Sequence, residues 1–212
     1  MQTDRQPVFY FDLASPYACL AAFRLEAVLP VPPVWRPVWM GPILAAAGRE
    51  WRRPAAEVRE RHADIERRAA GYGMPPWHWP EKYAAGRELG VDVEPINTLD
   101  VMRLATLADG AGVGEEFARR AFHLAFGEGR DITTVEDEVI AAAVACGLDA
   151  DDARAAPDDP EIKLALRNAT DAASARGVTG MPTVAIGDEL FWGDDRLEDA
   201  AAALAPRSGP GP

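Results

Sequence analysis

Ser15 and Pro16 stand where a short apolar run gives way to a helical pattern. The run from Val8 to Leu13 is aromatic and aliphatic apart from Asp12, which is typical of a buried strand. Ser15 is a preferred N-cap residue, and Pro16 suits the first helical turn because a missing N–H costs nothing there. We therefore expect the Ser15 hydroxyl at a helix N-terminus, where free N–H groups and the helix dipole favour an anion. Taken alone, the pattern favours a simple helix cap over a binding site.

The other residue types that carry chemistry are scattered along the chain. There are three histidines, His62, His78 and His123. They lack the spacing of metal ligands, so no metal site is expected. The two cysteines, Cys19 and Cys146, form no C-x-x-C motif and predict no disulfide framework. Cys19 lies one turn after Ser15 and is expected to be a buried small residue. No Ser-His-acid arrangement can be assembled, so Ser15 is not expected to be a nucleophile.

The charge balance narrows the classes of partner. The 212 residues carry 34 acidic and 22 basic side chains, a net charge of −12, whereas nucleic acids and anionic membrane surfaces require a basic face. We therefore expect neither nucleic-acid nor membrane binding. No apolar run approaches membrane-spanning length, and the N-terminus lacks the apolar core of a signal peptide, so the cytoplasm is the expected location.

The front of the chain indicates a strand, a helix and a second strand. The first apolar run is followed by a helical pattern over 17–29, which prolines end. Val34 to Trp39 is the second strand candidate, and Pro37 favours a sheet edge or the end of pairing. The middle of the chain is helical in character from Trp51 to Ala70 and from Asn97 to about Arg176, and an irregular loop occupies 71–80.

The back of the chain returns to strands. Thr183 to Ile186 and Glu189 to Trp192 flank Gly187-Asp188, which is a two-residue hairpin signal. A final helix is predicted over 197–204.

Neither end of the chain can bury the faces of its strands alone, so both ends are expected to join in one sheet. A β-α-β unit and a β-β-α unit in one sheet form the thioredoxin arrangement. The predicted fold class is therefore α/β, a thioredoxin-like fold with a large all-helical insertion. The discontinuous thioredoxin-like domain would comprise 1–50 and 174–205, and the helical insertion 51–173. The Pro- and Gly-rich residues 206–212 are expected to be a disordered tail.

The loop over 71–80 concentrates aromatic and proline residues and cannot continue a helix. Its rings include Trp77 and Trp79. They could line an apolar pocket, or they could fill the join between two helices. In the first case, Trp77, Trp79 and Tyr17 would contact a substrate.

Four segments, in order, resemble one family. Residues 9–17 contain Phe-Tyr-Phe-Asp and then Ser-Pro-Tyr, and residues 35–38 are Trp-Arg-Pro-Val. Residues 177–183 match a G-V-x-G-x-P-T loop, and residues 191–197 match F-W-G-x-D-R-L. Over almost its whole length the chain resembles the 2-hydroxychromene-2-carboxylate isomerases and the kappa-class glutathione transferases of the DsbA-like thioredoxin superfamily.

The resemblance implies a role for Ser15. This residue occupies the first position of the C-x-x-C motif of disulfide exchangers, and Ala18 occupies the fourth. A serine cannot perform thiol–disulfide exchange, so disulfide oxidoreductase activity is not expected. In the isomerase and kappa families the serine donates a hydrogen bond to the sulfur of glutathione. Ser15 is thus the candidate catalytic residue, and glutathione or another low-molecular-weight thiol is the implied cofactor.

The resemblance also implies contacts to the rest of the thiol. Pro182 corresponds to the cis-proline of the fold, and the Met181 backbone would pair with the cysteinyl part of glutathione as an added strand. Asp195 would meet the γ-glutamyl amine with Asp194 beside it, although either aspartate could instead cap the last helix. Arg49 lies at a further position where a contact to glutathione is expected. Arg49 and Asp194 depart from the family pattern, and the Asp194 carboxylate would repel the γ-glutamyl carboxylate, which leaves the identity of the thiol open.

The function that the resemblance implies is a thiol-dependent isomerase acting on a conjugated aromatic acid. A thiolate held by Ser15 would add reversibly to the substrate, a bond would rotate or the ring would open, and elimination would return the thiol. One alternative is a kappa-type glutathione transferase, which releases the adduct. Another is a non-catalytic, DsbA-like binding protein that lacks C-x-x-C. The expected partner is a small aromatic substrate, and the kappa class implies a homodimer.

Overall fold

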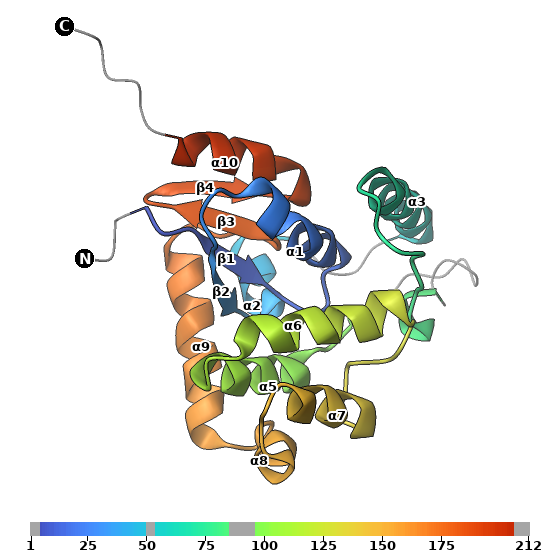
Figure 1. Ribbon diagram of the computed structural model, residues 1–212, viewed down its shortest axis with the longest axis vertical. Helices are drawn as coiled ribbons and strands as arrows, with labels where there is room; N and C mark the ends of the chain where they lie inside the picture. Colours follow the sequence, from blue (N-terminus) through green and yellow to red (C-terminus); the bar gives the residue numbers. More distant parts are fainter. Residues whose placement is uncertain (1–4, 50–53, 85–95, 206–212) are drawn as a thin grey trace, which may run out of the picture.

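A four-stranded mixed sheet joins the two ends of the chain (Figure 1). The computed structural model describes residues 5–49, 54–84 and 96–205. In the order β2-β1-β3-β4, the strands are β1 (Val8–Phe11), β2 (Val34–Pro37), β3 (Thr183–Ile186) and β4 (Glu189–Trp192). β1 runs parallel to β2 and antiparallel to β3, and β4 pairs antiparallel with β3. The predicted β-α-β and β-β-α units therefore share one sheet, and the predicted α/β, thioredoxin-like fold class is confirmed.

Side chains of β1 alternate between two hydrophobic cores. Phe9 and Phe11 lie on one face of the sheet with their ring centroids 5.7 Å apart, and Trp35 meets both rings edge-on. Tyr10 points to the other face, where it belongs to a separate cluster with Ala185. Both faces are thus buried, which explains why the strand sequence is an almost unbroken apolar run.

Helices cover both faces of the sheet (Figure 1). The core around Phe9 and Phe11 receives side chains from α1 (Pro16–Val28), α5 (Leu99–Gly110), α6 (Gly114–Phe122) and α10 (Leu197–Leu204). The core around Tyr10 receives side chains from α2 (Met40–Ala46) and α9 (Pro160–Ala175). α9 crosses the boundary predicted at residue 173, and it contacts both α2 and β2.

The other described elements are helical. They are α3 (Ala55–Gly71), the π-helical turn η1 (His123–Gly127), α7 (Asp137–Ala145), α8 (Ala150–Ala155) and the short 3₁₀ helix η2 (Asp194–Arg196). α3 packs on α1, where Ile65 and Ala69 surround Leu20. Among the described residues, no helix combines the length and the apolar character needed to cross a membrane. The predicted tail, 206–212, lies outside the described residues.

Asp12 ends the first strand before the predicted Leu13. Its carboxylate is 1% exposed. It accepts hydrogen bonds from the N–H groups of Ala14 (2.8 Å) and Met40 (2.7 Å) and from the Thr98 hydroxyl (2.8 Å). One buried side chain thus joins the end of β1 to the starts of α1, α2 and α5. Burial raises the pKa of Asp12, and the three hydrogen bonds oppose that shift.

The second strand also ends before the predicted residue, at Pro37 instead of Trp39. Pro37 has no N–H to give to a partner strand. The Trp39 N–H donates to the hydroxyl of Thr170 on α9, over 3.0 Å. The chain therefore leaves the sheet here and turns directly into α2.

Candidate functional site

Ser15 is the N-cap of α1, as the sequence pattern predicts. Its backbone is extended (φ −93°, ψ 109°), and its Oγ accepts a hydrogen bond from the Ala18 N–H over 3.2 Å. The same hydroxyl donates to the carbonyl oxygen of Met181 over 3.2 Å. Ser15 is 4% exposed. One buried hydroxyl therefore serves both as the helix cap and as the contact to a distant loop, at a point where the helix dipole favours negative charge.

The loop that faces the α1 N-terminus contains a cis peptide bond between Met181 and Pro182. The Thr183 hydroxyl donates to the Gly180 carbonyl oxygen over 2.7 Å. The Gly193 N–H donates to the Pro182 carbonyl oxygen over 3.0 Å. These bonds tie the loop to the start of β3 and to the segment after β4, and they hold the Met181 carbonyl in place.

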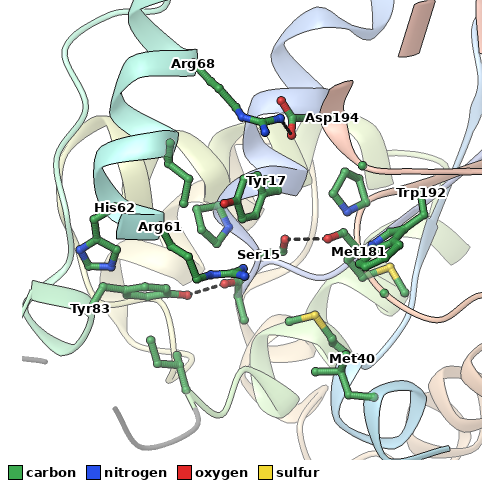
Figure 2. A pocket seen from close by; sticks show the side chains of 18 of the residues that line it. Ser15, Tyr17, Met40, Arg61, His62, Arg68, Tyr83, Met181, Trp192 and Asp194 are labelled. Atoms are coloured by element: carbon green, nitrogen blue, oxygen red, sulfur yellow. Dashed lines mark hydrogen bonds and ion pairs between the residues drawn. The ribbon is translucent and has the colours of Figure 1, made fainter. Parts of the chain in front are cut away.

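A cavity of about 440 Å³ opens beside the Ser15 hydroxyl (Figure 2). It lies among the N-terminus of α1, the helices α2 and α3, and the segments before β3 and after β4. Its volume is typical of small-molecule sites. The structure gathers around it seven residues that the sequence singled out: Ser15, Tyr17, Arg49, Met181, Pro182, Asp194 and Asp195.

Trp77 and Trp79 lie outside this cavity, contrary to the expectation that they line the substrate pocket. Trp77 stacks on Phe126 with ring centroids 4.9 Å apart. Trp79 stacks on His62 at 3.8 Å, and its Nε1 donates to Glu66 over 2.7 Å. Both rings thus pack in the join between α3 and η1, which was the alternative role, and Trp77 also lines a second, smaller cavity.

The apolar part of the cavity comes from residues that the sequence pattern did not single out as a site. α2 provides Met40 and Leu44, α3 provides Val58 and Ile65, and Ile96 completes this wall. Val58 and Ile65 lie on one apolar helix face, which is also the pattern of core residues. Helical spacing was the only signal for them, and it does not distinguish a core from the wall of a pocket.

Tyr83 is a further cavity residue that the sequence pattern did not indicate. Its hydroxyl donates to the carbonyl oxygen of Ala14 over 2.7 Å, one residue before Ser15. Burial raises the pKa of Tyr83 well above its ordinary value, and the nearby Asp12 carboxylate adds to the shift. The phenol therefore stays protonated and fixes the turn that leads into α1.

The Asp194 carboxylate is buried and paired. Asp194 is 1% exposed; its Oδ1 lies 3.0 Å from Nη1 of Arg68, and its Oδ2 accepts from the Tyr72 hydroxyl over 3.0 Å. Arg68 also lies 2.9 Å from Asp64 and 3.4 Å from Asp195. Burial raises the pKa of Asp194, and Arg68 opposes that shift. The carboxylate thus connects η2 to α3, and its pairing with Arg68 partly offsets the repulsion that the sequence suggested.

Arg49 and Asp195 bring side chains of opposite charge to the cavity. The Arg49 guanidinium lies 4.5 Å from the ring centroid of Trp192, and its Nη1 donates to the Thr179 carbonyl oxygen over 3.3 Å. The Asp195 side chain is 57% exposed. Asp195 also lies 3.4 Å from Arg68, so both charged groups have partners within the protein.

Cys19 takes no part in this site. It lines a second cavity of about 180 Å³ together with Trp77. Burial raises the pKa of its thiol well above the ordinary value, and a buried neutral thiol is a poor nucleophile. Within 5–49, 54–84 and 96–205, no group of three or more His, Cys, Asp or Glu side chains could hold a metal ion.

Comparisons of sequence agree with the fold. The family model of the DsbA-like thioredoxin domain matches residues 8–205. A 2-hydroxychromene-2-carboxylate isomerase of Sphingobium xenophagum is 30% identical over 196 residues, which are 90% of this chain and 93% of that protein.

Two solved structures share the fold at lower identity. A 2-hydroxychromene-2-carboxylate isomerase superposes with a TM-score of 0.78 at 21% identity and covers 93% of both chains. A probable DsbA oxidoreductase from Streptomyces coelicolor superposes with a TM-score of 0.71 at 22% identity, over 94% of this chain and 88% of that one. The resemblance that four short segments indicated is confirmed. The protein belongs to the DsbA-like thioredoxin family and is a relative of 2-hydroxychromene-2-carboxylate isomerase.

Proposed function

We propose that this protein is a thiol-dependent isomerase that acts on a conjugated aromatic acid. The observation that carries the proposal is the Ser15 hydroxyl at the N-terminus of α1, beside a cavity of about 440 Å³. With Ser15 and Ala18 at the two positions of C-x-x-C, no dithiol is available for disulfide exchange. The Sphingobium relative bears the name of an isomerase, which favours isomerisation among the reactions open to a serine site.

The donor set around the cavity fits a low-molecular-weight thiol such as glutathione. Ser15 would hold the sulfur, the backbone of Met181 would pair with a peptide-like part of the thiol, and the exposed carboxylate of Asp195 would take its ammonium group. A bound thiol supplies a sulfur nucleophile that can add to a conjugated double bond and leave again. Asp195 suits a thiol that carries an ammonium group, and it does not restrict the choice to glutathione.

Ser15 is suited to stabilise an anionic sulfur. The dipole of α1 favours negative charge at this point. A thiol placed there has a lowered pKa, so more of it is thiolate near neutral pH. The hydroxyl proton is shared with the Met181 carbonyl oxygen, and rotation about the Cβ–Oγ bond would direct it to a sulfur atom instead.

The wall formed by α2 and α3 would orient the substrate. Met40, Val58 and Ile65 line the cavity, and such side chains pack against an aromatic ring and exclude water from the reacting bond. Tyr83 holds the backbone directly before Ser15, so the hydroxyl keeps its position while the substrate binds.

Calorimetric titration with glutathione and with other low-molecular-weight thiols tests the cofactor. We expect the wild-type protein to bind at least one of them, and Ser15→Ala to bind it about tenfold more weakly, since a hydrogen bond to a charged group is lost. Ser174→Ala, on α9 and away from the cavity lining, is the matched control. Turnover of 2-hydroxychromene-2-carboxylate in the presence of each thiol, followed by absorbance, tests the reaction.

The outcomes separate the competing functions. Absence of thiol binding by the wild-type protein, or turnover that is unchanged in Ser15→Ala, would refute the proposal. A stable thioether released as product and detected by mass spectrometry would assign transferase chemistry. Activity on a panel of conjugated aromatic acids would argue against a non-catalytic binding protein.

A further inference from the structure

Arg61 projects from α3 into the cavity beside Ser15 (Figure 2). Its guanidinium carbon lies 5.1 Å from the centre of the Tyr17 ring, and Figure 2 shows its side chain directed toward Ser15. The residue is half-buried. A cation therefore stands next to the place where the proposed reaction would occur.

The partners of Arg61 differ from those of the other arginines that line the cavity. Arg68 is paired with three aspartates. Arg49 donates to a backbone carbonyl and lies over an indole ring. Within 5–49, 54–84 and 96–205, the structure gives Arg61 the face of Tyr17 and no carboxylate partner. Its charge is thus available to an anionic ligand.

The surroundings of Arg61 strengthen such a contact. Val58 and Ile65 lie on the same helix face, three residues before and four residues after it, and both line the cavity. In apolar surroundings a charge-assisted hydrogen bond is stronger than in water. The planar guanidinium group also presents two parallel N–H donors, which match the two oxygens of a carboxylate.

We propose that Arg61 binds the carboxylate of the aromatic substrate and thereby sets which carbon of that substrate lies next to Ser15. The inference rests on the proposed function, because it takes the conjugated acid to be the molecule that enters the cavity beside the thiol. Arg61 is then a specificity-determining residue. The site accepts an aromatic acid and discriminates against the corresponding neutral amide or ester.

The carboxylate that Arg61 would bind is assigned to the substrate and not to the thiol, because Arg61 and Met181 lie on opposite sides of Ser15. Met181 lies on one side of Ser15 and Arg61 on the other (Figure 2). A thiol paired with the Met181 backbone would occupy the first side. The second side carries the apolar residues Val58 and Ile65, which suit an aromatic ring.

Calorimetric titration of the full-length protein with trans-cinnamate and with trans-cinnamamide tests the inference. The two probes share an aromatic ring and a conjugated double bond and differ in charge. We expect the wild-type protein to bind the acid about tenfold more tightly than the amide, and Arg61→Met, which keeps the apolar stem, to remove that preference. Arg59→Met, exposed on the same helix, should keep the preference. Arg61→Gln gives the same readout if the methionine variant does not fold.

Two results would overturn the inference: a preference for the acid that survives in the Arg61 variants, and a wild-type protein that binds neither probe. Failure of the proposed function gives a different result. If no thiol binds and no turnover occurs while binding of the acid still depends on Arg61, the isomerase proposal fails and the Arg61 site stands. Turnover that Arg61→Met leaves unchanged would refute the Arg61 site alone.

Discussion

Arg68 on α3 and Asp194 at the start of η2 are 126 residues apart in the sequence and form an ion pair of 3.0 Å. The Tyr72 hydroxyl donates to the other oxygen of the same carboxylate, so both oxygens of Asp194 have partners. The pair fastens the helix that forms one wall of the cavity to the segment that forms another. The shape of the cavity therefore depends on this contact as well as on the sheet.

Removal of Arg68 should destabilise the protein strongly. Arg68→Met leaves the buried Asp194 carboxylate without its cation, and we expect the free energy of unfolding to fall by roughly 3 kcal/mol in urea denaturation. Part of this loss should return in the double variant Arg68→Met/Asp194→Leu, which buries no unpaired charge. Arg67→Met, whose side chain is 74% exposed, is the control. An equal loss in the control variant would contradict the assignment.

Asp12 makes stability depend on pH in a defined direction. Its pKa is raised above the ordinary 3.8, so the folded protein binds this proton more tightly than the unfolded chain does. The contribution of Asp12 is therefore largest below pH 3.8 and declines as the pH rises through the raised pKa. The difference in unfolding free energy between wild type and Asp12→Asn should shrink over that interval. Urea denaturation from about pH 4 to about pH 8 measures it, and a difference that is constant with pH would count against this role.

Tyr83→Phe should affect both stability and thiol binding. The variant loses the hydrogen bond to the Ala14 carbonyl, at a cost of about 1 kcal/mol, and frees the turn that positions Ser15. We expect weaker thiol binding in calorimetry, by a smaller factor than in Ser15→Ala. Tyr10→Phe, whose hydroxyl faces Arg176, should change stability without changing thiol affinity. Loss of affinity in both variants would show a general effect of lost stability.

Gly180 allows Trp192 and Arg49 to lie close to the loop before the cis bond. A Cβ at this position would lie 2.7 Å from Nε1 of Trp192 and 3.1 Å from Nη1 of Arg49. Gly180→Ala should displace both side chains and weaken thiol binding, with little loss of stability because the indole is partly exposed. Gly71→Ala, where an added Cβ meets nothing within 4 Å, should leave thiol binding unchanged. Calorimetry and thermal melting measure the two effects.

Rebuilding C-x-x-C should create a disulfide exchanger. In Ser15→Cys/Ala18→Cys, the first thiol would lie at the N-terminus of α1, where its pKa is lowered, and the second would lie one turn further on. We expect the double variant to reduce insulin in the presence of dithiothreitol. Ser15→Cys alone should be much slower, since it has no resolving thiol. If the double variant and the wild-type protein reduced insulin at equal rates, the two cysteines alone would not be sufficient for oxidoreductase activity at this site.

The order of strands and helices in the thioredoxin-like part of the fold could be predicted, because the sequence patterns that indicate it are local. The Ser15-Pro16 pair gives the N-cap and the first turn of α1, and Gly187-Asp188 connects β3 to β4 at the predicted strand limits. Capping and hairpin turns depend on neighbours along the chain, which the sequence displays directly. Both ends of the chain contain strands whose faces need burial, and a common sheet for the two ends predicted the α/β arrangement.

The contacts between distant segments could not be predicted. Asp12 interrupts an apolar run in the sequence, and only the fold reveals that donors 28 and 86 residues away surround it. In the sequence, Asp194 suggests a ligand contact or a helix cap. Only the packing of α3 shows that Arg68 is its partner. For Trp77 and Trp79, clustering in the sequence indicated aromatic packing and could not say whether a cavity or another ring would lie beside them.

The hydrogen bond from Ser15 to Met181 competes with any hydrogen bond that Ser15 could donate to a ligand in the cavity. The Ser15 hydroxyl already donates to the Met181 carbonyl oxygen over 3.2 Å. A ligand atom therefore receives this hydrogen bond only if it is a better acceptor than the carbonyl oxygen. The sulfur of a neutral thiol is a weak acceptor, whereas a charged sulfur forms the stronger, charge-assisted kind of bond. The protein would thus select the deprotonated form of a thiol through competition with its own Met181 carbonyl oxygen.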